Sequence, residues 1–227
     1  MFRGVLIDIE KALWKVEEDA AHQDEAKNRL ALQLGYPDPA ALWGIIASRL
    51  RRYQTWAEAE CRELGDFALW HEWLYPESDE TRLRFTCHSL TSLLRQAEGR
   101  RKTHPGALRT IRALYDRGCR LGIVSNSIGE QEAPGWLEET GTKQYFETVV
   151  ISALCGTRKP DPRLFSIACE ELGLPPAECA SIGYGSTEGE KAAGIGASIR
   201  LAGMEGQDRP DYIVDRFSEI LELPGLR

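Results

Sequence analysis

The chain has 227 residues, of which 42% are hydrophobic and 28% charged, and this composition excludes a largely disordered protein. Its net charge of -7 argues against a nucleic-acid-binding protein, which needs a basic surface to meet the phosphate backbone. No run approaches the roughly 20 apolar residues of a membrane helix and the N-terminus carries no leader pattern, so we expect a cytoplasmic protein without a membrane partner.

The first predicted element is a buried strand over residues 4–8, with the sequence GVLID. A short apolar run that ends in an acid is typical of a parallel strand whose carboxyl end meets solvent. Asp8 closes this run and Glu10 follows two residues later. We therefore expect both carboxylates at the edge of a sheet.

A long segment over 13–103 has helical periodicity and contains five of the six tryptophans. Side chains of this size need a core, which predicts a separately packed helical unit. Trp43, Trp70 and Trp73 are expected in that core, and the alternative is that they line a ligand cleft. The basic run at 100–102 is predicted to lie in solvent, where it could guide an anionic substrate.

Beyond residue 104, helical segments alternate with short apolar runs. Strands are predicted at 121–125, 147–151, 179–183, 198–201 and 211–214. Such alternation is typical of a parallel sheet covered by helices on both faces, with ligands bound at the carboxyl ends of the strands. The predicted fold class is therefore α/β, with a Rossmann-like core over 1–13 and 104–227 and an inserted, all-helical cap over 14–103.

The cysteines and histidines indicate no further site. The six cysteines show no CxxC pair and no metal-ligand spacing, which predicts small buried side chains in a reducing compartment. His71, His88 and His104 are scattered, and none lies at a recognisable spacing from a nucleophile, so we expect structural roles for them.

Polar residues follow the other predicted strands at the end where Asp8 is expected. Ser125 and Asn126 close the strand at 121–125, Lys159 lies in GTRKPDP, and the loop GYGSTEGE occupies 183–190. Taken singly, Ser125 is a capping hydroxyl and Lys159 a solvated surface lysine. Together, at neighbouring strand ends, they favour a catalytic or binding site.

The order of these segments resembles the haloacid dehalogenase superfamily, most of whose members are magnesium-dependent phosphatases. Three stretches carry the resemblance, namely VSN at 124–126, KPDPRLFSIACEELGLPPAEC at 159–179 and PDYIVDRFSEILEL at 210–223, and together they resemble the subgroup with an inserted helical cap.

The resemblance also implies roles for individual residues. Asp8 would be the nucleophile that forms an aspartyl-phosphate, and Glu10 would be the general acid and base. Lys159 would neutralise charge on the nucleophile and the transferred group, while Ser125 and Asn126 would bind the phosphoryl oxygens.

The resemblance further implies Mg²⁺, held by Asp8, Glu10 and an acid of the last loop. The family has aspartate directly after the glycine of that loop, but here Tyr184 follows Gly183, and a neutral phenol is a poor magnesium ligand. Glu188 is the remaining candidate ligand.

The segment after Glu10 also departs from the family pattern. The family continues with glycine and threonine, whereas this chain has Lys11 and Ala12. The Lys11 ammonium would contact the substrate and replace part of the missing divalent charge.

The functional prediction is a hydrolase that acts through Asp8 on a small phosphorylated metabolite, with the cap excluding water. Two alternatives stay open from the sequence. One is a catalytically inactive relative that binds a ligand or a partner, because fold does not guarantee function. The other is a metal-free hydrolase similar to a 2-haloacid dehalogenase, in which the aspartate displaces a halide. The sequence predicts neither the substrate nor the oligomeric state.

Overall fold

The computed structural model describes residues 1–226, with Glu205 described by its backbone alone. Its centre is a six-stranded sheet in the order β5-β4-β1-β6-β7-β8, in which every recorded pairing is parallel. The strands are β1 (Gly4–Ile7), β4 (Arg120–Ser125), β5 (Phe146–Ile151), β6 (Cys179–Gly185), β7 (Ala197–Glu205) and β8 (Tyr212–Val214). The predicted α/β fold with a parallel sheet is confirmed. Asp8 directly follows β1, and β1 lies in the middle of the sheet, between β4 and β6.

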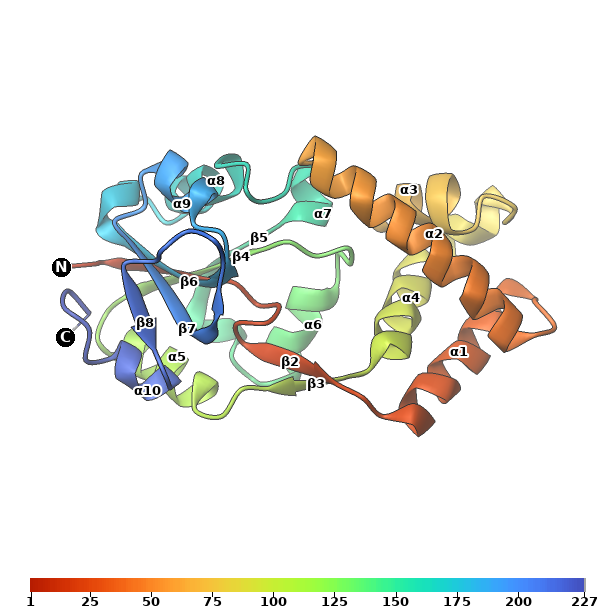
Figure 1. The fold of residues 1–227 in the computed structure, drawn as a ribbon, viewed down its shortest axis with the longest axis horizontal. Coiled ribbons are helices and arrows are strands. Elements are labelled where there is room, and N and C mark those ends of the chain that lie inside the picture. The colour runs from red at the N-terminus through yellow and green to blue at the C-terminus, as the bar shows by residue number, and fades with distance from the viewer. Residues whose placement is uncertain (227) are drawn as a thin grey trace.

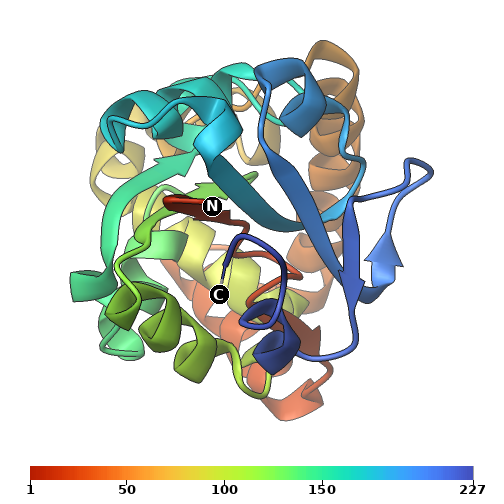
Figure 2. The same ribbon diagram turned by 90° about the vertical axis from the view of Figure 1, so that its left-hand side faces the viewer.

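Helices cover both faces of this sheet (Figures 1 and 2). The helices of the core are α5 (Ala107–Asp116), α6 (Glu132–Glu139), α7 (Ser152–Cys155), α8 (Arg163–Glu171), α9 (Glu188–Ala193) and α10 (Phe217–Ile220), with short 3-10 turns η2 (Lys143–Tyr145) and η3 (Pro176–Glu178). Side chains of β1 alternate between the two faces. Val5 and Ile7 belong to a core shared with α5, α6 and α10, whereas Leu6 packs in a second core with α8.

A helical insertion packs around its own core beside the sheet (Figure 1). Its elements are α1 (Ala20–Leu34), α2 (Pro39–Glu60), α3 (Asp66–Ala68), a π-helical turn η1 (Leu69–Leu74) and α4 (Glu80–Glu98). Asp38 caps α2 by accepting hydrogen bonds of 3.0 Å from two backbone N–H groups of its first turn. Trp70 is buried in this core, and Trp43 and Trp73 pack against it, as expected. Over residues 1–226, no helix is both long and apolar enough to cross a membrane.

Both ends of the predicted helical segment are strands. β2 (Trp14–Glu17) pairs antiparallel with β3 (Arg100–Thr103), and this ribbon lies where the chain leaves and re-enters the core (Figure 1). The helical prediction for these residues is wrong, because periodicity over four residues cannot distinguish a strand from a helix. The boundaries 14 and 103 of the predicted cap stay a prediction.

Candidate active site

Asp8 is held by residues from separate strand ends. Its side chain is buried, and its backbone N–H donates to the Ile182 carbonyl at 2.8 Å. The Ser125 hydroxyl donates to Asp8 Oδ1 at 2.7 Å, and the Lys159 ammonium contacts Oδ2. Lys159 Nζ also donates to the Val124 carbonyl at 3.1 Å. The structure therefore brings together three of the residues that the sequence assigned to one site.

Asn126 fixes the segment that carries Lys159. Its side-chain amide donates to the Lys159 carbonyl at 3.1 Å and its Oδ1 accepts from the Lys159 N–H at 2.7 Å. These two bonds set the backbone from which the ammonium reaches Asp8. The substrate contact predicted for Asn126 stays a prediction, although its side chain lines the cavity at Asp8.

The environment of Asp8 changes its ionisation. Burial raises the pKa of the Asp8 carboxyl above its ordinary value, while Lys159 and the Ser125 hydroxyl act in the opposite direction. Because only the carboxylate is nucleophilic, Asp8 becomes reactive at a higher pH than an exposed aspartate would.

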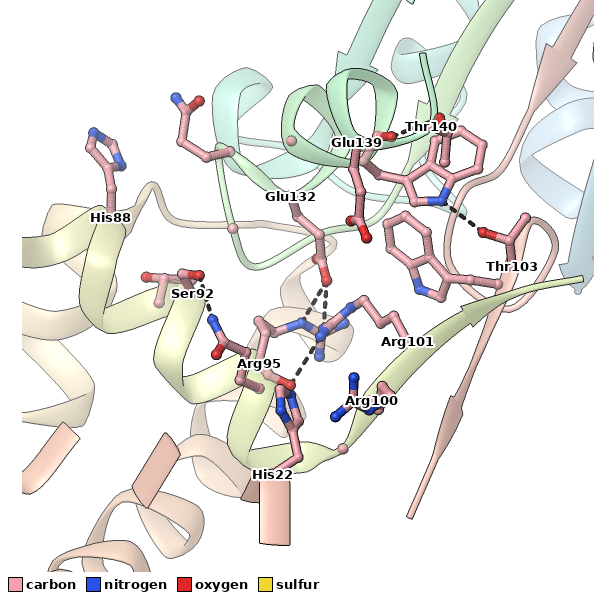
Figure 3. Close-up of a pocket in the computed structure, with 18 of the residues that line it drawn as sticks. His22, His88, Ser92, Arg95, Arg100, Arg101, Thr103, Glu132, Glu139 and Thr140 are labelled. Carbon is pink, nitrogen blue, oxygen red and sulfur yellow. Dashed lines mark hydrogen bonds and ion pairs between the residues drawn. The ribbon is translucent and has the colours of Figure 1, made fainter. Parts of the chain in front are cut away.

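Glu10 is bound by the cap rather than by the core. Its Oε1 accepts a hydrogen bond of 2.8 Å from Arg95 Nη2, on α4. The same guanidinium binds Glu132 at 3.0 Å (Figure 3), and it also contacts Glu98. Burial alone would raise the pKa of Glu132, but the charges of Arg95 and Arg101 outweigh this effect, and the pKa lies below its ordinary value. The result is a compact ionic network that connects Glu10 to both parts of the fold.

Sequence reasoning missed Arg95. The signal was a cationic residue within the buried stripe of α4, close to Leu90, Leu93 and Leu94. A buried arginine needs anionic partners, so its position indicated a contact with acids of another element.

The basic run at 100–102 is only partly in solvent. The side chains of Arg100 and Lys102 are 61% and 64% exposed, but that of Arg101 is 18% exposed and lies 2.6 Å from Glu132. The expectation is therefore wrong for Arg101. Successive side chains of a strand point to opposite faces, and these three residues lie on β3 rather than on a helix.

Lys11 lies over the ring of Tyr184. Its Nζ is 4.5 Å from the ring centroid, and Lys159 Nζ is 5.9 Å from the same centroid. Within residues 1–226, Lys11 forms no ion pair with Asp8 or Glu10. Its backbone has a φ of 63°, in the left-handed region that favours glycine. Lys11 thus contacts the ring of Tyr184, beside the site.

Tyr184 lies on β6, directly after Gly183, where the family resemblance implies a metal-binding aspartate. Burial raises the pKa of its phenol above the usual value, and the charges of Asp8 and Glu10 act in the same direction. The phenol is therefore neutral at pH 7. Mg²⁺ prefers carboxylate and water oxygens in an octahedral arrangement, so Tyr184 is a poor ligand for it.

The acids of the last loop do not replace the missing carboxylate. Glu188 is exposed, whereas Glu190 is buried, where it accepts a hydrogen bond of 2.5 Å from Ser181 and pairs with Arg200 at 2.9 Å. Arg200 itself is 1% exposed. A Cβ added at Gly183 would lie 3.4 Å from Arg200 and 3.7 Å from Asp8, so a buried cation already lies beside this strand end.

The predicted metal ligands are therefore unsuited to Mg²⁺. The carboxylates of Asp8 and Glu10 are engaged by Lys159 and Arg95, and the carbonyl of Glu10 accepts the N–H of Ala12 at 2.7 Å. A divalent ion beside Asp8 would compete with the cationic side chains of Lys159, Arg95 and Arg200. These residues do not fit the metal site that the family resemblance implies.

Asp8 opens into a small cavity of about 160 Å³. Its lining includes Asn126, Lys159, Tyr184, Ser186 and Arg200. Cavities for drug-sized ligands span about 300–1,000 Å³, so this one suits a small substrate. A larger cavity of about 440 Å³ lies elsewhere, between cap and core, and is lined by Arg95, Arg101 and Glu132 (Figure 3).

A family model described as haloacid dehalogenase-like hydrolase matches residues 2–193. The chain belongs to this family. Members of the family typically use Mg²⁺.

Curated relatives match this haloacid dehalogenase-like hydrolase over part of their length. Pyrophosphatase PpaX of Bacillus pumilus is 32% identical over 125 residues, which cover 52% of this chain and 57% of the relative. Glyceraldehyde 3-phosphate phosphatase of Methanopyrus kandleri is 29% identical over 135 residues, or 54% of this chain and 56% of the relative. The chain thus spans about half the length of the curated relatives it matches.

Solved structures match the fold of the whole chain. A 2-haloacid dehalogenase from Pseudomonas syringae pv. Tomato has a TM-score of 0.70 at 17% identity, covering 98% of this chain and 97% of that one. A HAD phosphatase from Thermococcus onnurineus has a TM-score of 0.62 at 21% identity, with coverages of 97% and 96%. These similarities establish the architecture, a parallel-sheet core with a helical insertion, and nothing about the reaction.

Proposed function

We propose that this protein is a hydrolase that attacks small phosphate esters through the Asp8 carboxylate. The observation that carries the proposal is the convergence of Ser125 and Lys159 on the two oxygens of a buried aspartate. The cavity beside Asp8 has room for a small substrate. The phosphatase and pyrophosphatase activities named for the curated relatives support phosphoryl compounds as the substrate class.

The reaction would proceed in two displacements. An Asp8 oxygen forms a bond to phosphorus while the bond to the ester oxygen breaks, and the alcohol leaves with a proton. Water then attacks the phosphorus of the aspartyl-phosphate and gives a proton to Glu10, which releases inorganic phosphate and restores the Asp8 carboxylate. Lys159 and the Ser125 hydroxyl stabilise the negative charge that develops in both steps.

Glu10 can donate the proton to the leaving oxygen only after its present contacts change. In the structure, Glu10 Oε1 accepts a hydrogen bond from Arg95 Nη2 and is therefore not free to donate a proton to the leaving oxygen. Proton donation requires that Glu10 leave Arg95, which belongs to the cap, and take up a proton from solvent. Movement of the cap would control this step.

The charge balance at Asp8 distinguishes this proposal from a magnesium-dependent reaction. Lys159 and Lys11 supply positive charge at the site, and Lys11 acts there through the Tyr184 ring. We therefore expect turnover that survives chelation of divalent ions.

A second candidate is attack by Asp8 on the carbon of a small 2-haloacid. The poor fit of Tyr184, Glu188 and Glu190 to a metal site favours it, because no phosphoryl dianion needs neutralising. An Asp8 oxygen would bond to carbon while the carbon–halogen bond breaks, and halide leaves as an anion without a proton. Water would then hydrolyse the ester, which releases a hydroxy acid, restores the Asp8 carboxylate and gives one proton to solvent.

One experiment separates these proposals. Phosphate release from a panel of phosphate monoesters and halide release from 2-haloacids are measured with Mg²⁺ and with EDTA. Asp8→Asn, which keeps the shape of the side chain, should abolish whichever activity is found, while Asp161→Asn in the neighbouring loop should retain it. Activity that survives Asp8→Asn contradicts both candidates. Absence of both reactions favours the inactive, ligand-binding alternative.

A further inference from the structure

A second cluster of ionisable side chains lies where the cap meets the core. Asp66 begins α3 and His88 lies on α4, both in the cap, whereas Glu130 precedes α6 in the core. One possible ligand atom from each residue lies within 4.8 Å of the other two. We propose that these three side chains bind a divalent transition-metal ion, and specifically Zn²⁺, at a site separate from Asp8.

The three side chains already lie close enough to share an ion. His88 Nδ1 is hydrogen-bonded to Asp66 Oδ2 at 2.6 Å and lies 3.9 Å from Glu130 Oε2. Ligands bound at roughly 2.1 Å in a tetrahedron lie about 3.4 Å apart, so an ion would replace this hydrogen bond and move the His88 and Asp66 atoms slightly apart. Glu130 Oε1 accepts the Asp66 N–H at 2.8 Å, and this bond fixes the carboxylate while Oε2 faces the histidine. Small side-chain movements would complete the site.

A second observation that indicates a ligand is a buried oxygen of Asp66 without a hydrogen-bond partner. The Asp66 side chain is 1% exposed, and its Oδ1 has no hydrogen-bond partner among the described residues. A buried carboxylate oxygen without a partner is costly. The cluster holds two carboxylates against one imidazole, so a cation would balance it.

The ligand types select the metal. Mg²⁺ and Ca²⁺ take oxygen ligands, whereas an imidazole with carboxylates suits first-row transition metals. Three protein ligands leave a fourth position for water, and zinc readily accepts this arrangement. Asp66 and His88 also line the larger cavity, and His88 lies at its edge (Figure 3), so an ion can reach them from solvent.

A metal here would hold the cap on the core, because its ligands come from both units. Zinc binding should therefore favour the closed arrangement in which Arg95 engages Glu10. This consequence concerns the position of the cap and does not depend on which bond Asp8 attacks.

The site is tested by titrating the full chain with Zn²⁺ against a chromophoric chelator and by locating zinc in crystals through anomalous scattering. The parent should bind one ion between cap and core. His88→Gln and Glu130→Gln should each weaken this binding at least about tenfold, a loss typical of disturbed metal sites. Circular dichroism confirms that the variants are folded.

Two controls make the result specific. His22→Gln changes another histidine that lines the same cavity, and it should leave zinc affinity unchanged. Asp8→Asn should also bind zinc normally, so a failure of the proposed hydrolase activity is distinguishable from a failure of this site. The proposal is overturned if the parent binds no zinc. It is also overturned if zinc binding survives both His88→Gln and Glu130→Gln, because the ion would then be bound elsewhere, for example by cysteine thiolates.

Discussion

The Ser125 hydroxyl donates a hydrogen bond of 2.7 Å to Asp8 Oδ1, across the boundary between β4 and the central strand β1. This bond stabilises the charged form of a carboxylate whose pKa is raised by burial. Ser125 therefore affects how much of the nucleophile is ionised at a given pH, in addition to any contact with substrate.

Replacing Ser125 with alanine should move the acid limb of the pH–activity profile to higher pH. The variant loses a bond that lowers the pKa of Asp8, so the carboxylate forms only at higher pH. A hydrogen bond to a charged group is worth about 1.5–3 kcal/mol, which corresponds to about 1–2 pH units. The measurement is kcat/KM against pH, with Ser166→Ala on α8 as the control. A shift to lower pH would contradict this role.

Lys159→Met should destabilise the fold in a pH-dependent manner. Loss of the ammonium leaves Asp8 buried without its cation, so the folded-state pKa of Asp8 rises further above the unfolded value. The folded state then binds its proton more tightly, and stability falls as pH rises above the unfolded pKa of about 3.9. Urea denaturation at pH 5 and pH 8 should show a larger loss, relative to the parent, at pH 8. An equal loss at both values would mean that Asp8 does not carry the effect.

The residues of this site that could be predicted from sequence are those that the strands of the sheet position. Asp8 and Ser125 each lie at the end of a short apolar run that alternates with helical segments, which is typical of a buried strand, and parallel neighbours end at the same edge. The particular partners, Glu10 for Arg95 and Glu130 for His88, were not predictable. Each pair joins a cap helix to the core, and periodicity within one unit carries no information about how two units lie against each other.

Arg95→Met should be much more damaging than Arg100→Met. Arg95 is buried and binds three carboxylates, so its loss leaves uncompensated charge, at a cost of about 3–5 kcal/mol in the free energy of unfolding. Arg100, nearby on β3, forms an exposed pair with Asp19, and solvent screening leaves such a pair little effect on stability. Urea denaturation of both variants measures the difference. Similar losses would show that the ionic network contributes little.

Tyr184→Asp should bind Mg²⁺ more tightly than the parent chain. The substitution puts a carboxylate beside Asp8, where the family pattern has one, and removes a bulky neutral phenol. Tyr184→Phe is the matched control, because it keeps the ring under Lys11 and adds no ligand. Calorimetric titration with Mg²⁺ should detect binding to the aspartate variant alone. Tight Mg²⁺ binding by the parent would refute our interpretation of the ligand set.

Lys11→Gly should be more stable than Lys11→Ala by about 1 kcal/mol. Both substitutions remove the ammonium and its contact with the Tyr184 ring, so they differ only in the backbone. Residue 11 has a φ of 63°, which costs an L-residue roughly 1–2 kcal/mol and costs glycine almost nothing. The greater freedom of glycine in the unfolded chain offsets part of this gain. Urea denaturation gives the stability difference, and activity assays on the same samples should show equal changes, because both variants lack the same charge. If alanine is as stable as glycine, the left-handed turn after Glu10 is not under strain.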